Sequence, residues 1–205
     1  MNTSQRKSDH IHIILTEDVT SGISTGLEKY QFEHNALPEI DFNEINLSTS
    51  FLGHSLRMPL LISSMTGGTK EAEQINRILA TVAQESGIAL GVGSLRAGME
   101  DSSVMDSFRV RQYAPDILLF ANIGAVQLNY GFTFREYQLM VDSIQANVLL
   151  LHLNPLQEAL QPEGNTNFSG LLKKIETICK KITVPVVVKE VGWGISGTVA
   201  RRLES

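Results

Sequence analysis

Five short apolar runs recur along the second part of the chain at a spacing of about 30 residues, and this repeat restricts the fold more than any other feature. Each run is followed by a polar or glycine-rich turn and then by an amphipathic stretch. The runs lie at residues 59–62, 88–92, 117–120, 148–151 and 184–188. Each unit therefore predicts a buried β-strand followed by a helix.

The amphipathic stretches carry apolar residues at the i, i+3, i+4, i+7 spacing that predicts one buried helix face. The three clearest sets are Ile75-Ile78-Leu79-Val82, Tyr137-Met140-Val141-Ile144 and Leu171-Ile175-Ile178-Ile182. A helix that covers the strand before it forces parallel strands joined by right-handed crossovers. A (β/α)8 barrel and a doubly wound sheet both satisfy this requirement.

The turns that follow the runs favour the barrel. Each of them carries polar or glycine-rich residues, and a site assembled from all the strand ends is typical of a barrel. No turn has the Gly-x-Gly-x-x-Gly pattern of a dinucleotide-binding fold. The turns are Ser64-Met65-Thr66-Gly67-Gly68, Gly93-Ser94-Leu95-Arg96, Asn122-Ile123-Gly124-Ala125, residues 152–158 and Lys189-Glu190-Val191-Gly192. We therefore predict the α/β class and a (β/α)8 TIM barrel.

The chain is short for such a barrel, which has eight units in roughly 250 residues. We expect residues 58–205 to form the first part of the barrel, about five of its eight βα units, in a longer protein. Residues 1–57 do not share the repeat and predict an N-terminal arm, extended and polar to about Asn35. The arm is expected to end in a short β pair formed by Phe42–Leu47 and Phe51–Leu56.

Composition and charge exclude several classes of partner. The 17 Lys and Arg residues against 22 Asp and Glu give a net charge of −5, which argues against nucleic-acid binding. No apolar stretch approaches the roughly 18 residues that span a bilayer, and polar residues interrupt the N-terminus where a signal peptide would be apolar. The single cysteine, Cys179, is interpreted as a core residue and favours a reducing compartment. We expect a cytoplasmic protein with no nucleic-acid or membrane partner.

The fourth apolar run ends in His152-Leu153-Asn154-Pro155-Leu156-Gln157-Glu158, the most chemically specific stretch of the chain. A carboxylate beside an amide and an imidazole offers oxygen ligands for a divalent cation and neutral donors for a phosphate. Glu158 is the candidate Mg²⁺ ligand. One alternative for the stretch is a strand followed by a capped loop, in which Asn154-Pro155 is only a turn. The alternative for Glu158 is a charge at the start of a helix that only complements the helix dipole.

Two groups of cations are candidates for phosphate binding. Arg96 follows Ser94 at a strand end, where a guanidinium can bind phosphate through two hydrogen bonds. Arg6 and Lys7 could fold over it and add charge. Alternatively, Arg96 pairs with Glu100 or Asp101 on the surface, and the N-terminal pair is a solvated tail.

Lys189 follows three valines in a strand that should be buried on both faces. A buried ammonium is costly unless it is paired, and Glu190 points the other way by strand alternation. An anionic ligand in the barrel mouth would satisfy Lys189, although a carboxylate from another strand is an alternative partner. At the first strand end, Gly67-Gly68 permits close approach of a flat or anionic ligand, to which Ser64 and Thr66 offer hydroxyl donors.

Taken together, these motifs resemble the type 2 isopentenyl-diphosphate delta-isomerases, FMN-dependent flavoenzymes of the (β/α)8 class. The resemblance covers essentially the whole chain, and the joint order of the motifs at successive strand ends makes it specific. The motifs are Arg6-Lys7-Ser8-Asp9-His10, Met65-Thr66-Gly67-Gly68, Gly93-Ser94-Leu95-Arg96, Asn122-Ile123-Gly124, His152 to Glu158 and Val188-Lys189-Glu190-Val191-Gly192.

The resemblance implies interconversion of isopentenyl and dimethylallyl diphosphate in isoprenoid biosynthesis, with FMN, Mg²⁺ and NADPH (or NADH) as the flavin reductant. Protons would be added and removed at reduced FMN, with no net redox change and with Gln157 orienting the reacting end of the substrate. Glu158 would bind the Mg²⁺ on the diphosphate. We also expect a homo-oligomer. By the same resemblance, FMN would be contacted by Ser64, Met65, Thr66, Ser94, Asn122 and Lys189. The substrate would be contacted by Arg6, Lys7, Ser94, Leu95, Arg96, His152 and Gln157.

Three alternatives remain open at this point. The 205-residue chain could be an inactive fragment, because the family's contacts to the FMN phosphate lie mostly on later strands. It could belong to another FMN-dependent barrel oxidoreductase, acting on a hydroxy acid or a dihydropyrimidine and needing a base or nucleophile at a strand end. It could also be a non-catalytic open half-barrel that associates through its uncovered strand edge.

Overall fold

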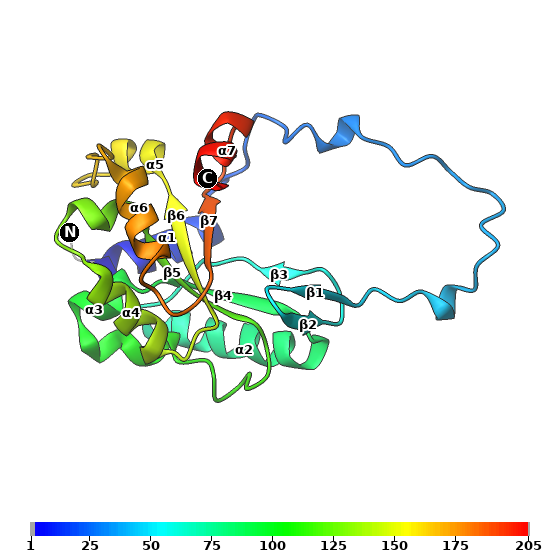
Figure 1. Cartoon of the computed structure of the whole chain (residues 1–205), viewed down its shortest axis with the longest axis horizontal. Helices are drawn as coiled ribbons and strands as arrows, with labels where there is room; N and C mark the ends of the chain where they lie inside the picture. Colours follow the sequence, from blue (N-terminus) through cyan, green and yellow to red (C-terminus); the bar gives the residue numbers. More distant parts are fainter. Residues whose placement is uncertain (1–2, 205) are drawn as a thin grey trace.

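A computed structural model of the chain describes residues 3–204, and its centre is a parallel sheet with the strand order β3-β4-β5-β6-β7 (Figure 1). Every strand falls on or directly after one of the apolar runs, so the predicted strand positions agree with the structure. The strands are β3 Leu61–Ile62, β4 Ala89–Ser94, β5 Leu119–Gly124, β6 Val148–Leu153 and β7 Val186–Glu190.

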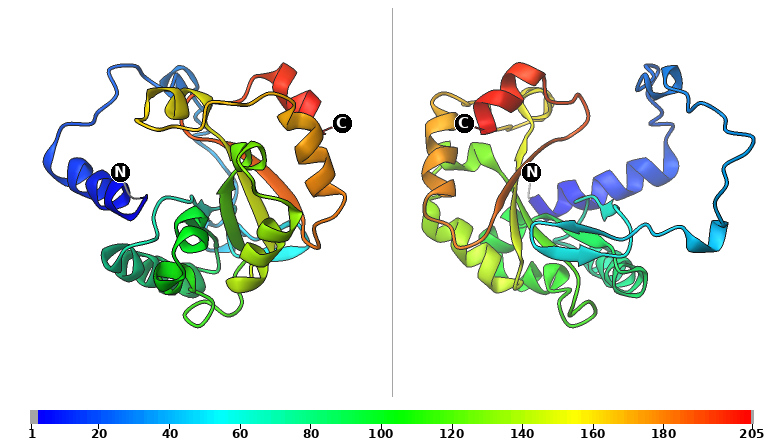
Figure 2. Two further views of the ribbon diagram at one scale, coloured as in Figure 1. Left: turned by 90° about the vertical axis from the view of Figure 1, so that its left-hand side faces the viewer. Right: turned by 45° about the vertical axis from the view of Figure 1, so that its right-hand side comes forward.

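The prediction of a (β/α)8 TIM barrel is wrong for this chain. Within residues 3–204 the parallel sheet contains five strands, and a separate antiparallel pair brings the total to seven. A barrel closes only when its last strand bonds to its first, but β3 and β7 stand at opposite ends of the sheet (Figure 2). The sheet is therefore an open half-barrel with two edge strands.

The helices follow the strands as the repeat predicts. Three of them cover the strand before them: α2 Lys70–Ser86, α4 Phe134–Ser143 and α6 Leu171–Cys179, which follow β3, β5 and β6. Shorter helices lie at the carboxyl ends of strands and in the connections: α3 Arg96–Glu100, η3 Ser102–Phe108, η4 Ala125–Asn129, α5 Pro155–Leu160 and α7 Gly197–Glu204.

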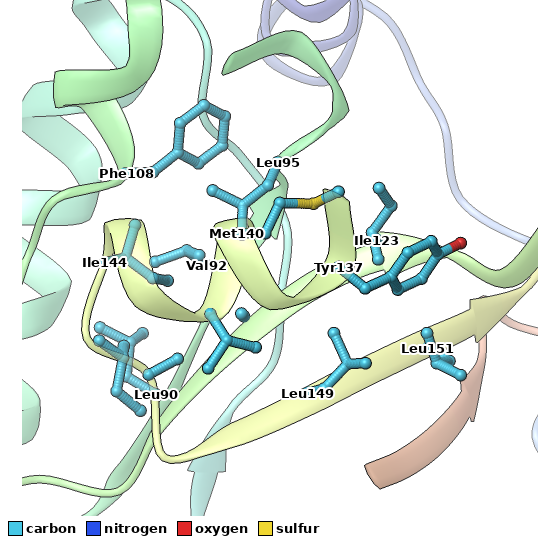
Figure 3. Close-up of a cluster of buried hydrophobic side chains, with 14 of the residues drawn as sticks. Leu90, Val92, Leu95, Phe108, Ile123, Tyr137, Met140, Ile144, Leu149 and Leu151 are labelled. Atoms are coloured by element: carbon cyan, nitrogen blue, oxygen red, sulfur yellow. The ribbon is translucent and has the colours of Figure 1, made fainter. Parts of the chain in front are cut away.

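The predicted buried face of α4 is confirmed. Tyr137, Met140 and Ile144 are almost completely buried against the strands (Figure 3). The helix begins with a capping box formed by Thr133 and Glu136, which satisfies free N–H groups of the first turn. Burial of each large apolar side chain contributes roughly 1.5–3 kcal/mol, so this face is a main source of the fold's stability.

The predicted face of α2 is wrong for two of its four residues, although Leu79 packs against the core as predicted. Ile78 and Val82 are 62% and 44% exposed. The buried face consists instead of Ala72, Asn76, Ala80 and Ala83. Small side chains allow the helix to approach the sheet closely, and hydrophobicity alone does not reveal that preference.

The third predicted helix face is confirmed, because Leu171, Ile175 and Ile178 of α6 are buried. Cys179, at the end of the same helix, was predicted to be a core residue but is exposed. It follows Ile178 directly and so lies beyond the edge of the buried stripe.

Strand alternation divides the sheet into two packed faces. On β6, Leu149 and Leu151 pack with the helices, as Figure 3 shows. Val148 and Leu150 point to the opposite, inner face, where they pack with Phe120 of β5. The next positions of this inner row are Asn122 and His152, so the polar residues at the strand ends stand above an apolar layer.

A β hairpin covers the lower end of this inner layer. It pairs β1 Thr49–Phe51 with β2 His54–Leu56 through a two-residue turn in which Leu52 and Gly53 both have positive φ, of 50° and 79°. This geometry suits the right-handed twist of the strands. Leu56 joins the inner apolar cluster.

The prediction for the first strand of this pair is wrong, because Phe42–Glu44 forms the short 3-10 helix η2. The Asp41 side chain accepts a hydrogen bond from the Asn43 backbone N–H there. This local bond favours the helical turn over an extended chain.

The N-terminal arm begins with a helix, α1 Thr3–Thr16, where an extended segment was predicted. Its polar sequence lacks Gly and Pro, and contacts with the end of β4 add the stabilisation that an isolated helix of this length lacks. Residues 17–48 then run in a wide, exposed loop away from the sheet and back (Figure 1), with one short 3-10 helix, η1 Leu27–Lys29, before η2. Among residues 3–204, no helix is both long and apolar enough to cross a membrane.

Candidate functional site

A cavity of about 280 Å³ lies at the carboxyl ends of the parallel strands, beside α1. Most of the predicted site residues line it, and they come from every strand end of the sheet and from α1. These residues are Lys7, Ser64, Met65, Ser94, Arg96, Asn122, His152, Gln157, Glu158 and Lys189.

Two predicted site residues do not line this cavity, and the side chain of a third is not described. Leu95 is fully buried in the apolar core. The backbone carbonyl of Thr66 accepts hydrogen bonds from Asn76 Nδ2 at 3.1 Å and from the Gly93 N–H at 2.8 Å, which fixes the turn after β3. The side chain of Arg6 lies outside the described part of the chain, so its predicted role stays a prediction.

Asn122 and His152 form a polar pair at the centre of the site. The two atoms Asn122 Oδ1 and His152 Nδ1 are 3.1 Å apart. Because a carboxamide oxygen only accepts, Nδ1 carries the proton and Nε2 remains an acceptor. A Cβ atom at Gly124 would lie 3.0 Å from His152 Nε2, so the glycine makes room for the ring.

The imidazole of His152 is neutral at physiological pH. Its pKa is lowered from 6.5 to about 4, chiefly by burial and in addition by the nearby charges of Lys189 and Lys7. Both lysines also line the cavity. The site by itself therefore disfavours one more positive charge.

Glu158 is buried and firmly held. Its Oε1 accepts a hydrogen bond from Asn154 Nδ2 at 2.8 Å, and its Oε2 accepts one from the Asn165 backbone N–H at 2.6 Å. It lies in the first turn of α5, which begins with Pro155. The helix dipole therefore stabilises its charge, as the simpler interpretation predicted, while the carboxylate also lines the cavity.

Arg96 combines both predicted alternatives. Its Nε forms an ion pair with Glu100 Oε1 at 2.6 Å, and its Nη1 donates to Asn165 Oδ1 at 2.9 Å. The guanidinium nevertheless lines the cavity. Two fixed hydrogen bonds hold its plane in one orientation, which suits the recognition of an anion.

Lys7 and Lys189 reach the cavity from different elements, α1 and β7. Lys7 Nζ donates to the Ser94 backbone carbonyl at 3.0 Å and lies 4.8 Å from the centre of the Phe108 ring. Lys189 Nζ donates to the Glu190 carbonyl at 3.3 Å, and burial lowers the pKa of this ammonium. The expectation that Lys189 belongs to a strand buried on both faces is wrong, since all positions of β7 are half-buried at the sheet edge.

Two buried polar atoms of the site have no hydrogen-bond partner within residues 3–204: Ser64 Oγ and Asn154 Oδ1. Ser64 packs over Gly91, where an added Cβ would lie 2.3 Å from the hydroxyl oxygen. Leaving a buried polar atom unsatisfied costs about 1–3 kcal/mol. Both atoms therefore favour a bound polar group at this end of the sheet.

The donor set limits the kind of metal the site can hold. In the part of the chain that the structure describes, no group of three or more His, Cys, Asp or Glu side chains is arranged to bind a metal ion. A structural zinc site needs such a group. One carboxylate, Glu158, together with an amide oxygen suits Mg²⁺, which keeps several waters and is shared with phosphate oxygens.

Sequence reasoning missed several residues of the site. Asn154 lies within the motif at residues 152–158 but received no role, and Gln127 and Asn165 were not considered. Gln127 lines the cavity and donates to Asn165 Oδ1 at 3.0 Å. Asn165 belongs to a loop after α5, and no local pattern distinguishes it from neighbouring polar residues.

Comparison with known proteins gives relatives for nearly the whole chain, although no protein-family model matches it. The isopentenyl-diphosphate delta-isomerase of Nostoc sp. is 55% identical over 202 residues, which are 98% of this chain and 58% of the relative. The proteins of the same name from Synechocystis sp. and Rickettsia bellii are 56% and 54% identical over 204 and 198 residues, 99% and 97% of this chain. The chain spans 58% of the length of each of these relatives.

Proposed function

We propose that the protein is a type 2, FMN-dependent isopentenyl-diphosphate delta-isomerase of isoprenoid biosynthesis, which interconverts isopentenyl and dimethylallyl diphosphate. One observation carries the proposal: a single cavity combines the cations Lys7, Arg96 and Lys189 with the buried carboxylate Glu158. Such a set suits a diphosphate that carries a divalent cation. The relatives bear the name of this activity over 97–99% of the chain.

In this proposal Arg96 and Lys7 bind the diphosphate. His152 lies beside this group, and its Nδ1 stays bonded to Asn122. Burial is the chief cause of its low pKa and persists when a ligand covers the site, so the ring stays neutral and its Nε2 can accept a hydrogen bond from a water bound to the diphosphate.

The remaining residues would hold the cofactors. Glu158, with the unsatisfied Asn154 Oδ1 beside it, would hold Mg²⁺. Ser64, Met65, Ser94, Asn122 and Lys189, which line the cavity, would hold FMN, and Thr66 would contribute from the turn directly after Met65. The unsatisfied Ser64 hydroxyl, which packs on Gly91, suits such a ligand. Reduced FMN, maintained by NADPH or NADH, would supply proton donation and removal. Lys189 would favour a negative charge on the flavin by Coulomb attraction.

Gln157 would orient the reacting end of the substrate. Its Oε1 accepts from Asn154 Nδ2 at 3.2 Å, and its side chain is exposed toward the cavity from the first turn of α5. An amide cannot transfer a proton at neutral pH, so the role is one of positioning. Cytoplasmic location and homo-oligomerisation stay predictions.

The test begins with titration of the purified chain with FMN, followed by flavin absorbance and fluorescence. An assay with FMN, Mg²⁺, NADPH and isopentenyl diphosphate then measures formation of dimethylallyl diphosphate. We expect saturable FMN binding and turnover in which NADPH is consumed only to reduce the flavin. Consumption of NADPH in step with product would instead indicate an oxidoreductase, and absence of FMN binding would contradict the proposal for this chain.

A further inference from the structure

We propose that Asn165 is a positioning residue that fixes Arg96 and Glu158 relative to each other, and so sets the spacing between the anion-binding and cation-binding ends of the cavity. The inference rests on the proposed function for the identity of the ligand, a diphosphate with Mg²⁺. Asn165 itself lies in the loop between α5 and α6.

The contacts of Asn165 join three strand ends. Its backbone N–H donates to Glu158 Oε2 at 2.6 Å. Its side-chain Oδ1 accepts from Arg96 Nη1 at 2.9 Å and from Gln127 Nε2 at 3.0 Å. Since Arg96, Gln127 and Glu158 follow β4, β5 and β6, one residue ties together the central part of the site.

The loop that carries Asn165 packs tightly against α5, which makes this connection rigid. A Cβ atom at Gly164 would lie only 1.8 Å from the backbone oxygen of Glu158, so this position requires glycine. The Gly164 N–H also donates to the Gln161 carbonyl at 3.2 Å. The backbone of the loop therefore lies directly against α5.

The arrangement keeps two opposite charges apart. A direct ion pair between Arg96 and Glu158 would use the groups that the anion and the cation need. Asn165 instead gives each of them a hydrogen bond from a different atom, and Arg96 forms its ion pair with Glu100. Both groups can therefore face the cavity in fixed positions without neutralising each other.

The test is isothermal titration calorimetry of the full chain with inorganic pyrophosphate in the presence of Mg²⁺. N165A removes the acceptor for Arg96 and Gln127 but keeps the backbone N–H, and we expect about tenfold weaker binding, the size of one lost charge-assisted hydrogen bond. N165D keeps an acceptor oxygen but adds a carboxylate against Arg96, so we expect it to bind pyrophosphate no better than N165A, because the new charge neutralises the guanidinium and repels the anion. The matched control is N167A in the same loop, and it should bind as the parent does, because the Asn167 Oδ1 accepts a hydrogen bond from the nearby Ser169 N–H and not from a residue of the cavity, as far as residues 3–204 show.

A double-mutant cycle separates positioning from a general loss of structure. If Asn165 acts through Arg96, N165A should have no further effect on pyrophosphate affinity in an R96A background. Additive losses, or equal losses in N165A and N167A, would overturn the inference. Thermal melting of every variant checks that the folded state is retained.

The two proposals can fail separately. If the parent chain binds pyrophosphate and the variants behave as expected, but no isomerisation occurs, the positioning role stands and the proposed activity does not. If isomerisation occurs and N165A binds pyrophosphate as the parent does, the activity stands and the positioning role is wrong. Failure of the parent chain to bind pyrophosphate with Mg²⁺ contradicts both.

Discussion

The central and the edge strands build two different halves of the same cavity. In the central half, His152, Asn122 and Glu158 stand on fully paired strands or directly after them, and their hydrogen bonds are formed within the chain. At the edges, Met65 is 75% exposed and Lys189 belongs to a half-buried strand. The first half is preorganised, whereas the second depends on a ligand for much of its packing.

The difference originates in the sheet, because every position of β5 is buried and every position of β7 is only half-buried. A strand with two neighbours fixes its side chains through packing on both flanks, while an edge strand has one free flank. Four measurements would test this contrast between the two halves of the cavity.

The largest effect concerns the pH dependence of stability. The pKa of His152 is about 4 in the folded chain against 6.5 in a free side chain, so the unfolded state binds more protons between these values. The contribution of His152 to the free energy of unfolding is fully present above pH 6.5. It decreases by about 3 kcal/mol in total as the pH falls toward 4. Urea unfolding from pH 7 to pH 4 measures the slope. His152→Gln should flatten it, and an unchanged slope in that variant would refute this explanation.

The second measurement compares the same substitution in the two regions. Val148 of β6 is completely buried, while Val187 of β7 is partly buried against the same inner cluster. Val148→Ala should lower the free energy of unfolding by about 2–3 kcal/mol, and Val187→Ala by about 1 kcal/mol, since less apolar area is lost. Denaturant unfolding gives both values. Equal losses would show that β7 is as well packed as the centre of the sheet.

The third measurement tests how tightly the His152 ring packs against Gly124. Gly124→Ala brings a Cβ to 3.0 Å from Nε2, so the ring must shift by a few tenths of an ångström. We expect about 1 kcal/mol of lost stability and several-fold weaker pyrophosphate binding. Gly192→Ala is the control, because an added Cβ there meets nothing within 4 Å. A Gly124 variant that binds and unfolds like the control would mean that the ring has room to move.

The smallest effect is expected at the edge. Met65→Ala should change the free energy of unfolding by less than about 0.5 kcal/mol in the ligand-free chain, because the side chain is 75% exposed. If the flavin covers it as proposed, the same variant should weaken FMN binding in a fluorescence titration. A large loss of stability without FMN would place Met65 in a packed environment and contradict the division into two halves.

How much of this could be predicted from the sequence depends on the range of the interactions involved. Apolar runs are a local property, so the sequence correctly indicated that Asn122 and His152 lie at the carboxyl ends of apolar strands, although both residues still belong to the strands β5 and β6 and not to the turns predicted there. The closure of a barrel depends on which strands pair, and the open sheet contradicted that prediction. The face of α2 was misjudged because close packing selected Ala80 and Ala83 over larger residues.

The site was predicted best where it lies on strand ends. Lys7 was expected over the cavity, and a hydrogen bond to the Ser94 carbonyl holds it there. Asn165 could not be predicted, because its importance comes from contacts with Arg96 and Gln127 that are 69 and 38 residues away in the sequence. Sequence motifs thus identify the residues that contact a ligand more readily than they identify the residues that hold those contacts in position.

The exposed loop at residues 17–48 makes the docking of α1 an intramolecular reaction. A tether of this kind supplies the docked partner at an effective concentration of roughly millimolar order, whatever the protein concentration. A single proteolytic cut in the loop would turn α1 into a separate peptide, and its occupancy would then follow ordinary mass action. In the cut protein, dilution alone would therefore dissociate α1 and remove Lys7 from the cavity. No residue that contacts the Lys7 ammonium would need to change for this to happen.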